Sequence, residues 1–121
     1  MIDFPIPHIP PIKFVDSLIS SDEKNASVKI KFDQIPTIGM LVEAAAQSSS
    51  GIDDGNKEKI QMGFLIALKN IKLLEEPLSK EYILNIHLDH KIENFKSFSF
   101  IVLDNDKKVA SGSISISLEE V

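Results

Sequence analysis

A glutamate and a glutamine stand where a sheltered carboxyl group could do acid–base chemistry. Glu43 and Gln47 are four residues apart within the segment from Pro36 to Gly51, and on a helix this spacing puts both side chains on one face. A sheltered carboxyl group is costly unless it is paired, protonated or used. Glu43 is therefore the first candidate for catalysis. The alternative is a structural glutamate paired with a backbone amide or a lysine.

The two histidines in the C-terminal half of the chain raise the question of a metal site. His87, Asp89 and His90 fall within one predicted strand. Strand alternation puts His87 and Asp89 on one face and sends His90 to the other. Only two ligands would then converge, so we expect no metal and no cofactor.

The segment that carries Glu43 is predicted to be a helix of unusual composition. Thr37 can cap its start, strong helix formers follow, and Gly51 can end it in a left-handed conformation. Small side chains cover most of its circumference, namely Ala44, Ala45, Ala46, Ser48 and Ser49. Such a helix has no broad polar face. We therefore expect a curved sheet to wrap around it.

The rest of the chain is predicted to form antiparallel strands. Alternation indicates strands near 26–32, 82–89 and 108–118, and apolar or aromatic residues indicate two more near 13–20 and 95–103. Hairpin turns are predicted at 22–25 and 104–107. The run 62–74 is apolar with little alternation, as expected for a strand covered on both faces. One helix buried against such a sheet makes an α+β architecture. A long apolar strand left at an edge would favour dimerisation.

Composition limits the class of protein. The chain has 121 residues, 43% of them hydrophobic and 26% charged, which fits one globular domain over residues 1–121. No apolar run approaches the roughly 20 residues of a membrane span. The start, with an acid and several prolines, is unlike a signal peptide, so we expect a cytoplasmic protein without a membrane partner.

Charge and cysteine content exclude further chemistries. The chain has no cysteine, which rules out disulfides, thiolate metal sites and a cysteine nucleophile. The net charge of −5 argues against nucleic acid as a partner, because binding phosphates needs a basic surface. All 13 basic residues are lysines, so no guanidinium is present to grip a carboxylate or phosphate.

Three blocks resemble the 3-hydroxyacyl-acyl carrier protein dehydratases. Pro7-His8-Ile9-Pro10-Pro11, followed by Phe14-Val15-Asp16, is similar to their Leu-Pro-His-Arg-x-Pro…Leu-Val-Asp-Arg opening. Leu41 to Gln47 resembles their Leu-x-Glu-Ala-x-Ala-Gln helix, and Gly63-Phe64-Leu65-Ile66 is similar to a strand of short dehydratase-like proteins of aryl polyene pathways. The resemblance implies a hot-dog fold, in which a curved antiparallel sheet wraps around one long central helix.

The same resemblance implies roles for several residues. Glu43 corresponds to the carboxylate that acts as acid or organises water, and Gly39 is a candidate donor to the thioester oxygen. Gln47 would support the carboxylate or contact the substrate. The family's histidine base is missing, because no Gly-His-Phe-Pro-Gly stretch precedes the helix. His8 is a candidate replacement, and the alternative is that it only packs the N-terminal segment.

Binding of an acyl carrier would involve further positions. Lys69 and Lys72 fall where the family carries basic residues near its tunnel mouth, although solvated lysines explain them equally well. Phe64 suits the lining of an acyl tunnel, although the core is the default place for it.

The resemblance implies dehydration of a 3-hydroxyacyl thioester in fatty acid or polyene synthesis. The alternatives are a non-catalytic thioester-binding partner subunit and an acyl-CoA thioesterase. The expected partners are an acyl carrier protein or coenzyme A thioester and a second copy of the chain or more. Another hot-dog protein is a further candidate partner.

Overall fold

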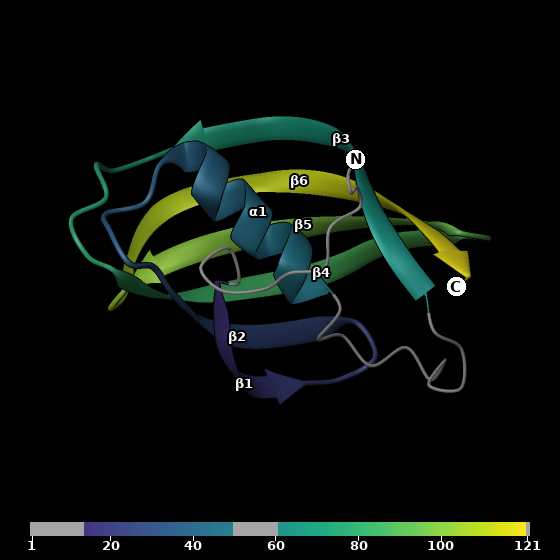
Figure 1. The fold of residues 1–121 in the computed structure, drawn as a ribbon, viewed down its shortest axis with the longest axis horizontal. Coiled ribbons are helices and arrows are strands. Elements are labelled where there is room, and N and C mark those ends of the chain that lie inside the picture. Colours follow the sequence, from purple (N-terminus) through teal and green to yellow (C-terminus); the bar gives the residue numbers. More distant parts are fainter. Residues whose placement is uncertain (1–13, 50–60, 121) are drawn as a thin grey trace.

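The computed structural model describes residues 14–49 and 61–120, with side chains at 14–49 and 65–117. These residues form a six-stranded antiparallel sheet in the order β1-β2-β4-β5-β6-β3, with one helix across one face (Figure 1). The elements are β1 (Val15–Ser21), β2 (Asn25–Lys31), α1 (Ile38–Ser48), β3 (Gln61–Leu73), β4 (Glu81–Ile92), β5 (Phe95–Asp104) and β6 (Lys107–Glu120). The predicted α+β architecture, with the helix packed on an antiparallel sheet, is confirmed.

The helix begins where the sequence predicts. Thr37 is the N-cap, and its Oγ1 accepts a hydrogen bond from the Met40 amide at 3.2 Å, which satisfies one of the free donors of the first turn. The helix is 11 residues long, or about three turns, and therefore shorter than the long helix expected. The predicted stop at Gly51 lies outside the described residues.

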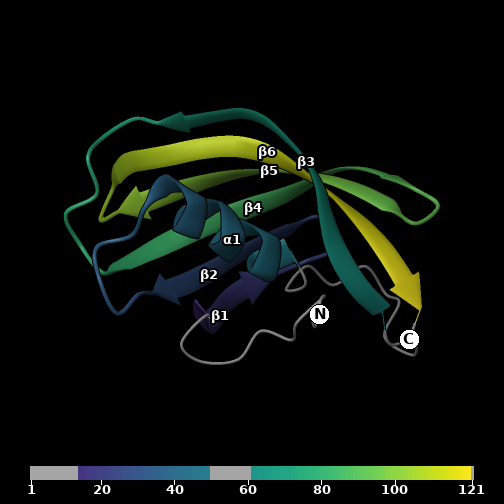
Figure 2. The same ribbon diagram turned by 45° about the horizontal axis from the view of Figure 1, so that its top comes forward.

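The sheet curves beneath α1 (Figure 2), and six of the 11 helix residues are buried. Leu41, Ala44 and Ala45 are fully enclosed. They pack against alternate residues of the strands, among them Val28, Ile30, Leu84, Phe98, Val102 and Ile114. Small helix residues let the sheet come close, as the composition of this segment predicts.

One side of the helix is left uncovered by the sheet. Gly39 is exposed and Glu43 is half-buried, whereas Leu41 and Ala45 are buried. Because Gly39 and Glu43 are four residues apart, they share the side that turns away from the sheet. This side of α1 is the part of the fold that positions the candidate site.

Strand β3 differs from its prediction. It pairs only with β6 and forms an edge of the sheet, and its side chains from Leu65 to Asn70 are exposed. The prediction of a strand covered on both faces is therefore wrong for the single chain. Apolar runs indicate a strand, but they do not indicate its place in the sheet.

Candidate functional site

Glu43 and Gln47 meet on α1 as the sequence predicts. Gln47 is buried, with 7% of its surface exposed, and its Nε2 donates a hydrogen bond to Glu43 Oε2 at 3.2 Å. The carboxyl group of Glu43 is thus half-buried and held from one side by an amide. A carboxyl group held in this way can exchange a proton with a bound molecule from a fixed position.

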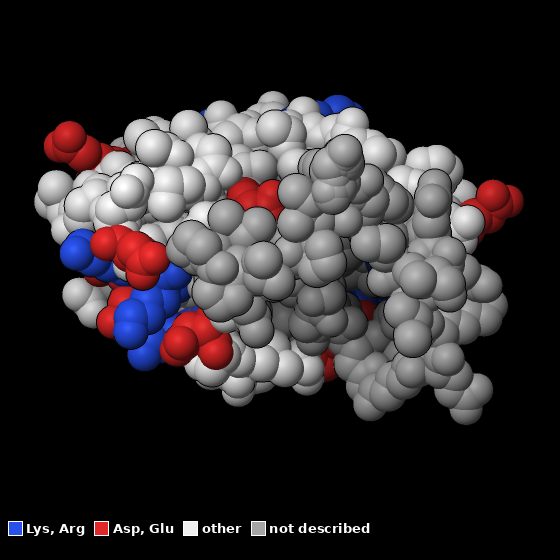
Figure 3. Space-filling model, in the orientation of Figure 1, with Lys and Arg blue, Asp and Glu red and all other residues white. Residues whose placement is uncertain are grey.

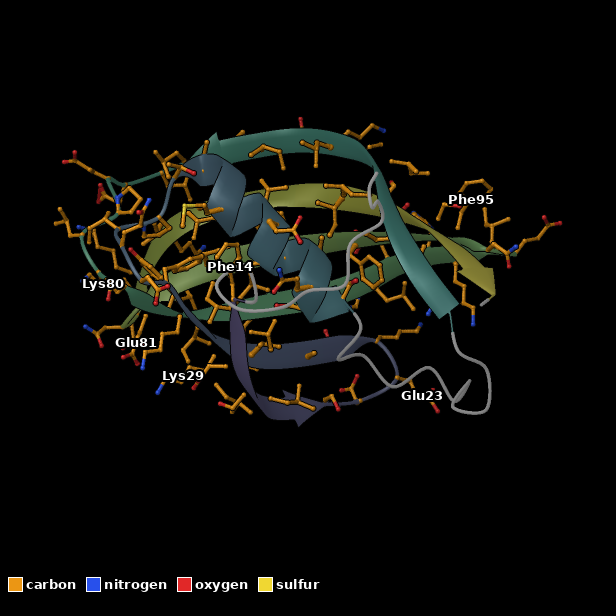
Figure 4. All side chains as sticks on the ribbon, in the orientation of Figure 1. Phe14, Glu23, Lys29, Lys80, Glu81 and Phe95 are labelled. Atoms are coloured by element: carbon orange, nitrogen blue, oxygen red, sulfur yellow. The ribbon has the colours of Figure 1, made fainter. Side chains whose placement is uncertain are left out.

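The orientation of Gln47 is set by a residue distant in sequence. The backbone N–H of Phe14, just before β1, donates to Gln47 Oε1 at 2.8 Å, and Phe14 lies beside the helix (Figure 4). Because Oε1 must face this donor, Nε2 faces Glu43. Sequence reasoning missed the Phe14 contact, since no local pattern relates positions 33 residues apart.

Gly39 lies in the first turn of α1, on the same side as Glu43. Amides of the first turn have no carbonyl partner within the helix, so they are available to an incoming oxygen. Among the described residues, and leaving out the backbone of the helix itself, the atom nearest to a Cβ built at Gly39 is Thr37 Oγ1, at 3.8 Å. The packing of the described residues therefore does not require glycine here.

The structure places the two described histidines far from this site. A β-bulge in β4 shifts the register, so His87 pairs with Ser99 and His90 with Ser97. Since Ser97 and Ser99 share a face, His87 and His90 do too. The prediction that His90 points the other way is therefore wrong. No group of three or more His, Cys, Asp or Glu suited to a metal ion occurs among the described residues.

The structure does not bring Lys69 and Lys72 to Glu43. They pair with Ser113 and Ser111 of β6, which lie on the face of the sheet opposite α1; we call this the outer face. A bulge at Asn70, which has a φ of 53°, puts both lysines on the outer face although they are three residues apart. His8 and the side chain of Phe64 lie outside the described residues.

On the described part of the helix face, lysine and acidic side chains lie side by side at one end of the molecule, and further acidic side chains lie at the centre and at the opposite end (Figure 3). Lys29, Lys80 and Glu81 lie at the first of these ends (Figure 4), and Lys29 Nζ is 3.2 Å from Glu81 Oε1. Both signs are therefore mixed there. The described part of this end therefore forms no broad basic patch of the kind that attracts an acidic protein.

Several solved structures share this fold. The dehydratase heterocomplex ApeI:P from Xenorhabdus doucetiae matches with a TM-score of 0.76 and 16% identity, over 94% of this chain and 88% of that chain. These neighbours are hot-dog proteins. The chain has a hot-dog fold. A candidate thioesterase from Syntrophus aciditrophicus also matches this hot-dog domain, with a TM-score of 0.69 and 13% identity over 92% and 88% of the two chains.

A homologue of HP0420 from Helicobacter felis matches with a TM-score of 0.65 and 21% identity, over 88% of this chain and 79% of that chain. No protein-family model matches the hot-dog chain, and no curated protein matches its sequence. At these identities the likeness establishes the hot-dog fold and leaves the activity open. Within the described residues, no helix has the length and apolarity needed to cross a membrane.

Proposed function

We propose that this hot-dog domain binds an acyl thioester beside α1 and dehydrates a 3-hydroxyacyl thioester to the trans-2-enoyl thioester. The observation that carries the proposal is the half-buried Glu43 carboxyl group, held by Gln47 on the side of the helix that the sheet leaves open. The ApeI:P dehydratase, which shares the fold, supports this reaction class by analogy.

The reaction needs three groups around the substrate. A base removes a proton from C2, Glu43 gives a proton to the C3 hydroxyl, and that hydroxyl leaves as water while a double bond forms between C2 and C3. Negative charge builds up on the thioester oxygen, where a backbone amide stabilises it. The Gly39 amide, in the first turn and four residues before Glu43, is suited to this role.

Of the three groups that the reaction needs, the base is the one that the described residues do not supply. His87 and His90 occupy outer-face positions, so neither can serve Glu43 within one copy. We assign the base to His8 or to a histidine of a partner subunit. That ApeI:P is a heterocomplex supports the second source, in which this chain binds the thioester and a second hot-dog protein completes the site.

A thioesterase is the second candidate. It is favoured by the likeness to the Syntrophus protein and by the fact that a helix carboxylate can activate water as readily as it can act as an acid. Hydrolysis would then release a free thiol and a carboxylic acid, and no enoyl product would form.

The test is to incubate purified protein with a 3-hydroxyacyl thioester and with the matching saturated thioester, on both carrier protein and coenzyme A. We expect enoyl thioester from the first substrate and no free thiol from either. Thiol release from both substrates would instead indicate the thioesterase. Enoyl product that forms only after a second hot-dog subunit is added would indicate the partner role, and no product in any mixture would contradict the proposal.

A further inference from the structure

The backbone of Phe14 is tied both to the sheet and to the helix. Its carbonyl oxygen accepts a hydrogen bond from the Lys31 amide at 2.8 Å, which ties Phe14 to β2. Its own N–H donates to Gln47 Oε1 at 2.8 Å, which ties it to α1. A shift of Phe14 would therefore move the Gln47 side chain, and with it the amide that binds Glu43.

The side chain of Phe14 lies against a buried ring. The ring centroids of Phe14 and Phe32 are 4.8 Å apart, and the two ring planes are inclined by 43°. At this separation aromatic rings attract each other in preferred geometries. Phe32 follows β2 directly and is 3% exposed, and a side chain in a close-packed core has little room to move. Phe32 therefore gives the Phe14 ring a rigid surface to rest on.

A third ring holds Phe32 in turn. The centroids of Phe32 and Tyr82 are 6.1 Å apart in an edge-to-face arrangement. The Tyr82 hydroxyl donates to the Ser79 carbonyl at 2.6 Å and accepts from the Ser79 amide at 3.1 Å. The Phe32 amide donates to the Lys80 carbonyl at 2.8 Å. Phe14, Phe32 and Tyr82 thus form an aromatic column that links the start of β1 to β4.

The aromatic column anchors one end of an edge strand. Strand β1 pairs only with β2, its ladder has two register shifts, and every β1 residue after Val15 is exposed. Such strands open locally at a low cost in free energy. Catalysis is sensitive to displacements of about 1 Å, which can cost about 10²-fold in rate. A carboxyl group oriented through Phe14 therefore needs Phe14 to be fixed by more than the β1–β2 ladder.

We propose that Phe32 is a positioning residue for Glu43. Its ring fixes Phe14, the Phe14 amide fixes Gln47, and the Gln47 amide fixes the carboxyl group. Phe32 thus acts through two other residues and takes no part in proton transfer. This role rests on the proposed function of Glu43 and adds a core residue to the groups that determine the rate.

Replacing Phe32 by leucine tests this role, because leucine keeps a large apolar side chain and removes the ring. We expect Phe32→Leu to lower kcat by about 10-fold or more and to change KM by less than about twofold. Phe100→Leu is the matched control, since Phe100 is 4% exposed and lies outside the aromatic column. It should lose stability as Phe32→Leu does and keep the wild-type kcat. A wild-type kcat in Phe32→Leu, or an equal fall in both variants, would overturn the proposal.

Substitutions at Phe14 decide the matter if Phe32→Leu does not fold, because Phe14 is only half-buried. Phe14→Leu keeps the backbone amide and removes the ring contact, so kcat should fall in the same way. Phe14→Tyr keeps the ring and should retain the wild-type rate. Equal rates in these two variants would count against the aromatic column.

Nuclear magnetic resonance tests the positioning without any turnover. The Gln47 side-chain amide donates to Glu43 Oε2, so its proton signals should shift as Glu43 is titrated with acid. This response should shrink in Phe32→Leu and persist in Phe100→Leu. The same response in Phe32→Leu as in wild type would overturn the positioning role. The expected pattern in a protein that forms no enoyl product would support the positioning of the carboxyl group and contradict only the proposed reaction.

Discussion

Gln47 fixes the orientation of the Glu43 carboxyl group. The Phe14 amide occupies its Oε1, and its Nε2 donates to Glu43 Oε2. The Gln47 amide therefore fixes the position of Glu43 Oε2 and with it the orientation of the carboxyl group.

Replacing Gln47 by leucine should reduce both stability and turnover. The Phe14 amide would lose its buried acceptor, at a cost of about 1 to 3 kcal/mol in the free energy of unfolding, and Glu43 would lose its fixed orientation. Urea denaturation and the rate of enoyl formation measure the two effects. Gln34→Leu, at an exposed glutamine, is the control, and equal behaviour of the two variants would argue against a special role for Gln47.

Local patterns predicted part of this site. The Glu43 and Gln47 pair follows from helix spacing, and the structure confirms the hydrogen bond between them. The Phe14 contact joins distant segments and has no local signal. The orientation of His90 was mispredicted because a bulge breaks the alternation on which it depended.

At the scale of the elements, one residue of β3 with an irregular backbone conformation determines how the strand packs on β6. The bulge at Asn70 brings Ile71 over Gly112 of β6, where a Cβ on Gly112 would clash with Ile71 Cδ1 and lie 3.2 Å from Ile71 Cα and Phe100 Cε1. The backbone of Ile71 cannot move aside without disturbing the β3–β6 ladder. Glycine at 112 is therefore required by close packing.

Gly112→Ala should lower the free energy of unfolding by about 1 to 3 kcal/mol, the usual cost of overpacking. Gly39→Ala is the same chemical change at a site where, among the described residues, the added Cβ would make only an ordinary contact with Thr37 Oγ1 at 3.8 Å. It should leave stability unchanged or raise it by up to about 1 kcal/mol through helix propensity. Thermal or urea denaturation of both variants is the measurement, and a stable Gly112→Ala protein would contradict the packing described here.

The β1–β2 hairpin depends on the charge of Asp22. Asp22 Oδ1 accepts hydrogen bonds from the amides of Lys24 and Asn25 at 2.9 and 2.8 Å. These bonds, the one from Lys24 first, hold the pKa of Asp22 below its ordinary value of 3.8. Stability from this turn is therefore present above pH 3.8 and is lost as the pH falls through the lowered pKa.

Asp22→Asn should accordingly be less stable than wild type near neutral pH, and the difference should shrink as the solution is acidified below pH 3.8. Unfolding by urea at a series of pH values measures it. Asp33→Asn, in an exposed loop, controls for the loss of one charge. A difference that stays constant down to low pH would contradict the linkage.

The helix and the strands could be predicted from the sequence because hydrophobic alternation and helix capping depend on residues that are close together in the chain. Thr37 marks the start of α1 correctly, and the β1–β2 hairpin forms around Asp22 as expected. The position of β3 could not be predicted, since an edge strand and a central strand can carry the same apolar run. Its exposure follows from the strand order, which depends on the whole fold.

In the molecule as a whole, the two edge strands of the sheet, β1 and β3, differ in how well they could pair with another chain. Strand β1 is short and has two register shifts, features that protect an edge from pairing. Strand β3 is 13 residues long and exposes Leu65, Ile66 and Leu68. The β3 edge is therefore the better suited of the two to pair with a second subunit, and the dimer expected from the sequence stays a prediction.

Ile66→Lys should lower the mass of the assembly by placing a charge in this edge contact. Leu18→Lys is a closely matched control, because Leu18 on β1 is 52% exposed and Ile66 is 51% exposed. Light scattering on both variants measures the effect. Equal masses for the two variants would show that β3 is not the pairing edge.

The role of Glu43 is decided by the rate at which a Glu43→Gln protein converts a 3-hydroxyacyl thioester to the enoyl product, compared with wild type. The substitution keeps an acceptor for Gln47 and removes the proton donor. We predict a fall of about 10²- to 10⁴-fold in kcat with the melting temperature unchanged. A variant that turns over the substrate as fast as wild type would contradict the assignment of Glu43 as the catalytic acid.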